Sequence, residues 1–164
     1  AFFVIGHKAD AHPELVRAIV AGGHVVGVHG YAHERLFALR GRRRVRRDLE
    51  RAVASLERIT GVRPVLFRPP IGHVSPAIAA IARELDLRAV GWSVRGVDGW
   101  RGARSERVAA RVARRLRNGA IVLLHDGAER GTHEPAGVRA LPAILETARR
   151  NGLGFVRVDA WLSD

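Results

Sequence analysis

Apolar runs of strand length alternate with segments of helical periodicity along the whole chain. The predicted strands are Phe2–Ile5, Val25–Val28, Val65–Phe67, Ala89–Trp92, Ile121–Leu124 and Phe155–Val158, and the predicted helices are Pro13–Ala21, Val45–Ile59, Pro76–Leu85, Glu106–Arg117 and Val138–Arg150. Alternation of this regularity is typical of α/β proteins with a mostly parallel sheet or a barrel. The chain has 164 residues and no recognisable linker. We therefore expect one α/β domain over residues 1–164.

Composition restricts the classes of protein and of site. Hydrophobic residues make up 47% of the chain and aromatic residues only 5%, which indicates an aliphatic interior. No apolar stretch approaches the ~18 residues of a membrane-spanning helix, and no export signal is visible. Cysteine is absent, so a metal site would use imidazole and carboxylate ligands. Methionine is also absent and Ala1 leads directly into an apolar run, so we expect the chain to be truncated on its N-terminal side.

The chain is strongly basic, with a formal net charge of +12. Its densest basic run lies at Arg40–Arg47. This run is either an electrostatic footprint for nucleic acid, an acidic polymer or anionic lipid, or the solvated start of a helix with partial compensation by Asp48, Glu50 and Glu57. No aromatic residue is interleaved with the run and no nucleic-acid-binding module is recognisable, so we expect no nucleic-acid partner.

Two histidines follow the second predicted strand. His29 and His33 are four residues apart, which places both on one face if the segment turns helically. Both imidazoles would then reach one metal ion, at the end of a strand where α/β proteins build their active sites. The alternative is a pair of polar histidines on a surface turn.

Three further segments follow predicted strands: Phe67–Gly72, Trp92–Trp100 and Leu123–Asp126. Taken singly, each could be a structural feature such as a surface ion pair, a rigid turn or a buried residue. In a parallel sheet, however, all three would lie at the sheet edge that carries the two histidines. Together they supply the parts of a metal-assisted hydrolase. His125 would be the general acid, and Asp98 would fix its tautomer and raise its pKa.

Other residues of these segments would handle the substrate. Arg68 would orient a carboxylate base, and backbone N–H groups around Pro70–Gly72 would face a developing oxyanion. Trp100, and with it Trp92, would form an apolar wall against a sugar ring or an acetyl methyl group.

These motifs resemble, nearly from end to end, those of the polysaccharide deacetylases, the NodB-like carbohydrate esterases of family four. The matching segments are Ala1–Gly6, Gly23–His33, Phe67–Gly72, Ile121–Asp126 and Ala140–Pro142. The resemblance implies a distorted, incomplete (β/α) barrel whose first strand is missing from this chain. It also implies a divalent metal ion, zinc above all but also cobalt or nickel, and hydrolytic removal of acetyl groups from amino sugars or acetylated glycans.

The resemblance assigns roles by position. His29 and His33 match metal ligands, Arg68 matches the residue that holds the catalytic base, His125 matches the acid and Asp98 its orienting partner. The residues that it places at the substrate are Pro70, Ile71, Gly72, Trp100 and Leu124. His12 and His24 match structural positions.

The chain also departs from the family pattern. A Thr-Phe-Asp-Asp-Gly-Pro motif, which supplies the general base and the third metal ligand in the family, is absent. Lesser departures are Gly30 in place of Ser or Thr, Ile71 in place of an aromatic residue, and Gly99 between Asp98 and Trp100. Because catalytic zinc normally takes three protein ligands, we expect a poor metal site. An absent first strand would expose a sheet edge and part of the barrel core, so we also expect a marginally stable, aggregation-prone chain.

Two functions follow. The first is a metal-dependent deacetylase acting on an acetylated glycan, with chitin oligomers, peptidoglycan and acetylated xylan all open as substrates. The second is a non-catalytic member that binds glycan without hydrolysis, which the retention of Arg68, Asp98 and His125 disfavours. The resemblance implies an extracellular or cell-envelope location, and we expect Arg40–Arg47 and Glu129–Gly137 to set specificity.

Overall fold

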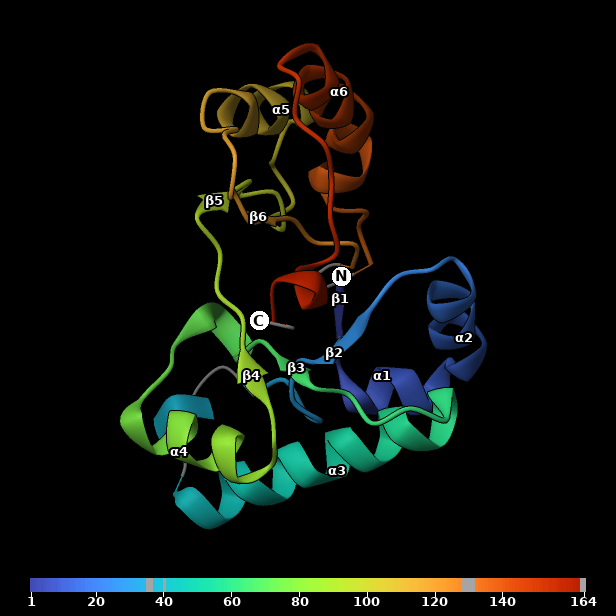
Figure 1. The fold of residues 1–164 in the computed structure, drawn as a ribbon, viewed down its shortest axis with the longest axis vertical. Helices are drawn as coiled ribbons and strands as arrows, with labels where there is room; N and C mark the ends of the chain where they lie inside the picture. Colours follow the sequence, from blue (N-terminus) through green and yellow to red (C-terminus); the bar gives the residue numbers. More distant parts are fainter. Residues whose placement is uncertain (35–36, 40, 128–131, 163–164) are drawn as a thin grey trace. The chain divides into compact units, whose positions relative to one another are not determined.

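The structure is a computed structural model that describes residues 1–34, 37–39, 41–127 and 132–162 (Figure 1). The chain divides into two compact units, the first formed by residues 1–90 with 156–164 and the second by residues 91–155. Each unit has its own sheet and its own hydrophobic core. The single domain expected from the sequence stays a prediction.

The first unit is built on a parallel sheet. Its four strands, β1 (Phe2–Val4), β2 (Val26–Val28), β3 (Leu66–Phe67) and β4 (Arg88–Ala89), lie side by side in chain order. Val4 is paired with Val28, and Val28 with Phe67. Because the strands run in one direction, the residues that follow β2 and β3 emerge at the same edge of the sheet.

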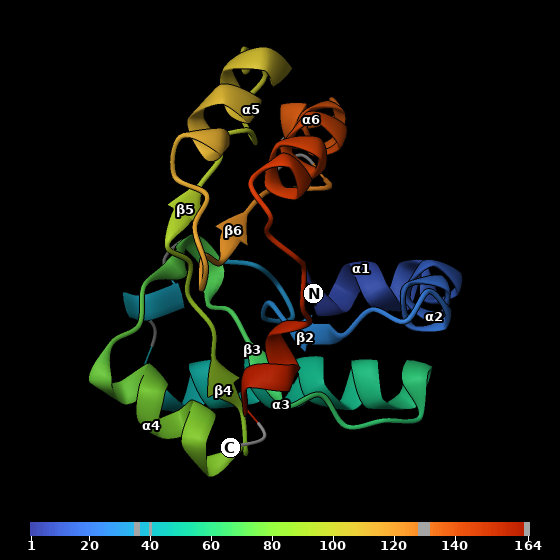
Figure 2. The same ribbon diagram turned by 45° about the horizontal axis from the view of Figure 1, so that its top comes forward.

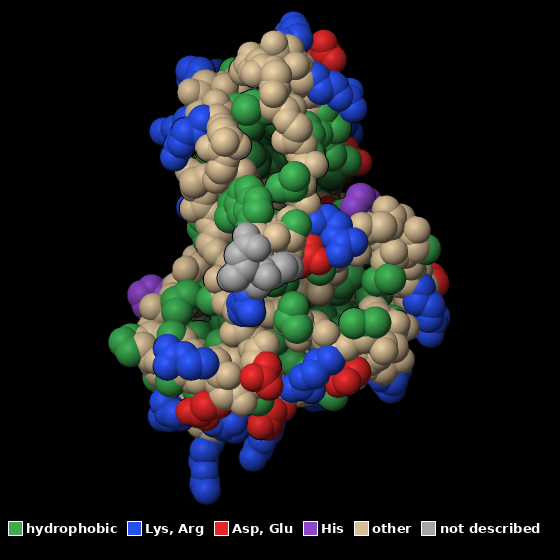
Figure 3. Space-filling model, viewed as in Figure 1, with side chains coloured by type: hydrophobic (Ala, Val, Ile, Leu, Met, Phe, Trp, Pro, Cys, Tyr) green, Lys and Arg blue, Asp and Glu red, His purple; other side chains and the backbone are tan. Residues whose placement is uncertain are grey.

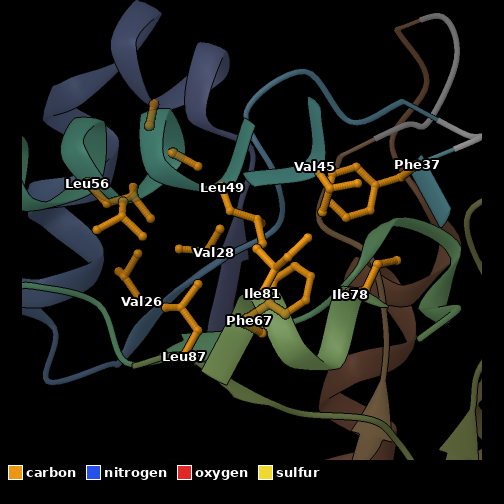
Figure 4. Close-up of a cluster of buried hydrophobic side chains, with 14 of the residues drawn as sticks. Val26, Val28, Phe37, Val45, Leu49, Leu56, Phe67, Ile78, Ile81 and Leu87 are labelled. Carbon is orange, nitrogen blue, oxygen red and sulfur yellow. The ribbon is translucent and has the colours of Figure 1, made fainter. Parts of the chain in front are cut away.

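Helices pack against this sheet. The long helix α3 (Arg42–Thr60) runs across it, with α1 (Gly6–Ala11) and α2 (Pro13–Ala21) at one end and α4 (Pro76–Glu84) at the other (Figure 2). Buried residues of α3 recur at helical spacing, as at Val45, Leu49 and Leu56, and turn one stripe toward the core. Figure 4 shows this stripe meeting side chains from β2, β3 and α4. Two short 3₁₀ turns, η1 (Phe37–Leu39) and η2 (Pro70–Gly72), complete the first unit's loops.

The second unit is smaller. Its strands β5 (Val94–Arg95) and β6 (Val122–Leu123) are parallel, with Val94 opposite Val122. Helices α5 (Ser105–Ala113) and α6 (Ala136–Arg150) pack together over them. The core consists of Val94, Val108, Val112, Ala140 and Ile144. No helix in the described parts of the chain combines the length and the apolar character that crossing a bilayer requires.

The expected α/β class with parallel strands is confirmed. The strands of the described residues form two open sheets and no closed barrel, in agreement with an incomplete barrel. The predicted strand Phe155–Val158 is wrong, because Phe155 and Val156 are exposed and the chain then enters a 3₁₀ turn, η3 (Val158–Leu162). Neither α1 nor β5 was predicted. α1 has no side-chain cap and is stabilised mainly by packing against α3.

The burial of α3 generates a stability prediction. Leu56→Ala removes a side chain that is 1% exposed, so we expect the free energy of unfolding to fall by about 2–5 kcal/mol. Leu15→Ala makes the same chemical change on α2, where the side chain is 59% exposed, and should cost much less. Urea unfolding of both variants measures the difference, and equal losses would contradict the core assignment.

Candidate functional site

The segment His29–His33, here called the histidine loop, directly follows β2. The His29 N–H donates to the Val4 carbonyl at 2.9 Å, and its Nδ1 lies 2.6 Å from the Arg68 carbonyl oxygen. The loop does not turn helically, because Gly30 and His33 have positive φ values of 76° and 52°. The helical turn expected from the spacing is therefore wrong. The two imidazole rings nevertheless lie 4.8 Å apart between centroids, tilted by 54°.

This geometry fits two positions of a metal site. Two imidazoles on one tetrahedral ion have ring centres about 5 Å apart. If His29 donates from Nδ1 to the Arg68 carbonyl, its Nε2 is the nitrogen left for an ion, and metal-bound histidines are commonly oriented in this way. Within the described residues, no group of three His, Asp or Glu side chains gathers at a common point. Metal binding at His29 and His33 stays a prediction.

A carboxylate from α3 holds the histidine loop in shape. Asp48 accepts the Tyr31 N–H at 2.8 Å with Oδ2 and the Ala32 N–H at 3.1 Å with Oδ1. A Cβ at position 30 would lie 2.9 Å from the same Oδ2, and the backbone there has φ 76°. Gly30 is therefore required by this arrangement. From its place in the sequence, Asp48 was expected only as a counter-charge for the arginine run, and its role in the loop was not predicted.

Arg68 is buried beneath the same edge of the sheet. Its N–H donates to the Val28 carbonyl at 2.9 Å, and its side-chain Nε donates to the Val90 carbonyl at 3.1 Å. The guanidinium carbon lies 4.2 Å from the centre of the Phe3 ring. Burial lowers the pKa of Arg68 to about 10. The side chain thus brings a positive charge into a desolvated position, where a nearby carboxylate would be strongly attracted.

The turn after β3 leaves a single candidate donor for an oxyanion. Pro70 has no N–H, and the Gly72 N–H already donates to the Pro69 carbonyl at 2.9 Å. Ile71 has φ 54° and ψ 6°, a left-handed conformation that is strained for a β-branched residue. Such strain is a feature of functional sites. Among Pro70, Ile71 and Gly72, only the Ile71 N–H is therefore a candidate donor to an oxyanion.

In the second unit a buried carboxylate holds a histidine. Asp98 is completely buried, whereas the His125 side chain is 40% exposed. The Asp98 carboxylate accepts the His125 N–H at 2.7 Å and lies 3.0 Å from His125 Nδ1. The hydrogen bond to Asp98 raises the pKa of His125, against burial, which acts in the opposite direction. Burial also acts to raise the pKa of Asp98, but the hydrogen bonds from His125 hold it below its usual range.

Two glycines make room for this pair. A Cβ at Gly137 would collide with the Asp98 carboxylate, and one at Gly99 would approach the His125 ring to 3.3 Å. The Ala136 N–H, at the start of α6, donates to the Asp98 carbonyl at 3.2 Å. In the sequence, Gly99 stands out only as a departure from the family pattern, and Gly137 only as part of the segment Glu129–Gly137 that was expected to set specificity. Their packing role depends on contacts between distant parts of the chain.

The remaining predicted substrate residues lie on the same unit as His125. Trp100 is 60% exposed, and its ring packs over Gly102. Leu124 and Trp92 are partly buried. An exposed indole on a loop that follows β5 is suited to stacking against a sugar ring. The structure thus places His29, His33 and Arg68 together on the first unit, and Asp98, Trp100, Leu124 and His125 on the second.

The Asp98–His125 pair generates a titration prediction. Asp98→Asn removes the charge and the hydrogen bond that raise the pKa of His125, so that pKa should fall toward or below the ordinary value of about 6.5. Asp126→Asn is the matched control, because Asp126 also carries a negative charge near His125 but affects its pKa least. Proton NMR titration of the His125 ring measures both. An unchanged pKa in Asp98→Asn would refute the assignment.

Comparison with known sequences identifies a family. The profile of the family described as polysaccharide deacetylase matches residues 1–90. Two proteins of Bacillus cereus, both named peptidoglycan-N-acetylglucosamine deacetylase, are each 31% identical to this chain. The aligned regions cover 94% and 98% of this chain, but only 55% of the first relative and 74% of the second.

Solved structures show the same fold. A family 4 carbohydrate esterase from Streptomyces lividans, in complex with acetate, superposes with a TM-score of 0.81 at 29% identity, over 92% of this chain and 74% of that one. A family 4 pseudoenzyme from Bacillus anthracis has a TM-score of 0.87 at 22% identity, over 99% of this chain and 54% of that one, which shows likeness of fold alone. From the profile match and the 31% identity to the Bacillus cereus relatives, this chain belongs to the polysaccharide deacetylase family.

Proposed function

We propose that this chain carries the catalytic domain of a metal-dependent deacetylase that hydrolyses acetyl groups on a glycan. The observation that carries the proposal is the fully buried Asp98 carboxylate bonded to a partly exposed His125. Burying a charged group is costly, and acid–base chemistry at His125 would account for the cost. Perturbed pKa values of this kind are typical of acid–base catalysts.

The proposed metal ligands are His29 and His33. A bound divalent ion would supply a polarised acetyl carbonyl and a bound water that is acidic near neutral pH. The family resemblance assigns the third ligand and the general base to an adjacent pair of aspartates, and no Asp-Asp occurs in residues 1–164.

His125 would complete the reaction as the general acid. With Nδ1 bonded to Asp98, the proton that His125 gives up is the one on Nε2. When water adds to the acetyl carbon and the carbon–nitrogen bond breaks, the leaving amine takes that proton. The raised pKa keeps His125 protonated to higher pH, which matches the needs of an acid. The Ile71 N–H would donate to the oxyanion, and Trp100 would contact the sugar.

A second function has one observation in its favour. No third acidic or histidine ligand joins His29 and His33 within the described residues. A glycan-binding protein without turnover would tolerate that, and a pseudoenzyme of this fold is known from the Bacillus anthracis structure. This alternative predicts glycan binding that survives removal of metal and loss of His125.

Release of acetate from chitohexaose and from peptidoglycan fragments separates the two functions. We expect His125→Gln to lower the rate by about 10²–10⁴, the usual contribution of general acid–base catalysis. His24→Gln is the matched control, because His24 packs against Phe2 and has no proposed role in the chemistry. Glycan binding with no acetate release by the unsubstituted protein would instead establish the non-catalytic function.

The pH dependence of the same reaction gives a further prediction. Because the acid form of His125 is needed, the rate should fall as the pH rises through the raised pKa of His125. Asp98→Asn should move this alkaline limb to lower pH. A limb that stays in place while the NMR pKa of His125 falls would show that His125 is not the acid.

A further inference from the structure

A cavity of about 250 Å³ adjoins the histidine loop of the first unit. Tyr31 and Ala32, which lie between the two predicted metal ligands, form one wall. Arg44, Arg47 and Arg51 of α3 line it as well. Ala32 in this wall is the sequence neighbour of His33, and adjacent Cα atoms are about 3.8 Å apart. We call this cavity the arginine pocket.

The basic run that begins α3 separates into two groups. Arg42 and Arg46 pair with Glu84 of α4, and Arg46 also approaches Glu50 at 3.9 Å. Arg44 and Arg47 lie on the face that lines the arginine pocket. In the portion of the chain that the structure describes, neither of these two has an ion pair. Figure 3 shows basic and acidic side chains mixed where α3 and α4 lie.

The acidic residues of the pocket do not neutralise it. The carboxylate oxygens of Asp48 accept the Tyr31 and Ala32 N–H groups, which directs its charge toward the loop backbone. Glu34 is the other acidic residue in the wall, so the guanidinium groups outnumber the carboxylates. Like charges three and four residues apart on a helix repel each other. An anion in the pocket would relieve that repulsion.

The walls of the pocket are held in place. The Arg51 guanidinium stacks over the Tyr31 ring, with its carbon 3.7 Å from the ring centre. Phe37 and Val45, which line the same cavity, are 3% and 2% exposed and belong to the hydrophobic core (Figure 4). Guanidinium groups bind the oxygens of carboxylate and phosphate in pairs. Apolar and guanidinium side chains in one pocket therefore suit an anionic group that is attached to a carbon skeleton.

We propose that the arginine pocket binds a carboxylate or phosphate substituent of the glycan whose acetyl group is removed beside the histidine loop. The proposal rests on the proposed function for the identity of the glycan, but the binding of the anion does not depend on turnover. It assigns the enzyme to anionic acetylated glycans, such as those with carboxylate-bearing peptides, in preference to neutral ones. It also gives Arg44 and Arg47, within the basic run, a specific role.

Calorimetric titration of the chain with three soluble probes tests this. The probes are a muropeptide with free carboxylates, an oligomer of glycerol phosphate, and neutral chitohexaose. The double variant Arg44→Gln with Arg47→Gln should weaken binding of an anionic probe about tenfold or more, since two charge-assisted contacts are lost. Arg42→Gln with Arg46→Gln is the matched control, because it removes the same charge from the face that pairs with α4.

The outcomes are distinct. Selective weakening for the muropeptide supports a carboxylate, and selective weakening for the glycerol phosphate oligomer supports a phosphate. Equal weakening by the two double variants would overturn the proposal, because net charge alone would explain it. Equal weakening for chitohexaose, or no binding of either anionic probe to the unsubstituted chain, would overturn it too. Failure to release acetate would count against the proposed function and leave these results standing.

Discussion

The parallel pairing of β1, β2 and β3 fixes the position of His29, on which the rest of the proposed metal site depends. Its backbone N–H bonds to Val4 on one neighbouring strand, and its imidazole reaches the Arg68 carbonyl next to the other. The ring is therefore oriented by the sheet ladder itself, before any ligand is present. Asp48 then shapes the following loop from outside the sheet, so that His33 returns to within 4.8 Å of the His29 ring.

In the second unit, a buried carboxylate positions the side chain of His125. A carboxylate with no exposed surface is stable only when its hydrogen-bonding capacity is filled, and Asp98 is bonded to both the backbone and the ring of His125. The glycines at 99 and 137 permit the close approach. The same contacts that satisfy the buried charge also raise the pKa of the histidine. The structural role of the pair thus coincides with its proposed catalytic role.

The sequence was sufficient for the alternation of most of the strands and helices. Alternating strands and helices predicted the parallel α/β fold, and the motif at His29 and His33 predicted that these rings meet. Features that depend on contacts between residues far apart in the sequence could not be predicted from it. The anchoring of the loop by Asp48 is one such feature, and the need for glycine at 30 and 137 is another. The apolar run at Phe155–Val158 was wrongly predicted to be a strand, because an apolar pattern does not show whether a neighbouring strand is available for pairing.

We propose that His29 and His33 together hold a divalent metal ion. Titration with Co²⁺, followed by its visible absorption, tests this most directly, because the spectrum reports both binding and the kind of ligand. We predict that one ion binds per chain, that His29→Gln and His33→Gln each abolish the signal, and that His24→Gln retains it. A signal that survives both substitutions, or no binding by the unsubstituted protein, would contradict this assignment.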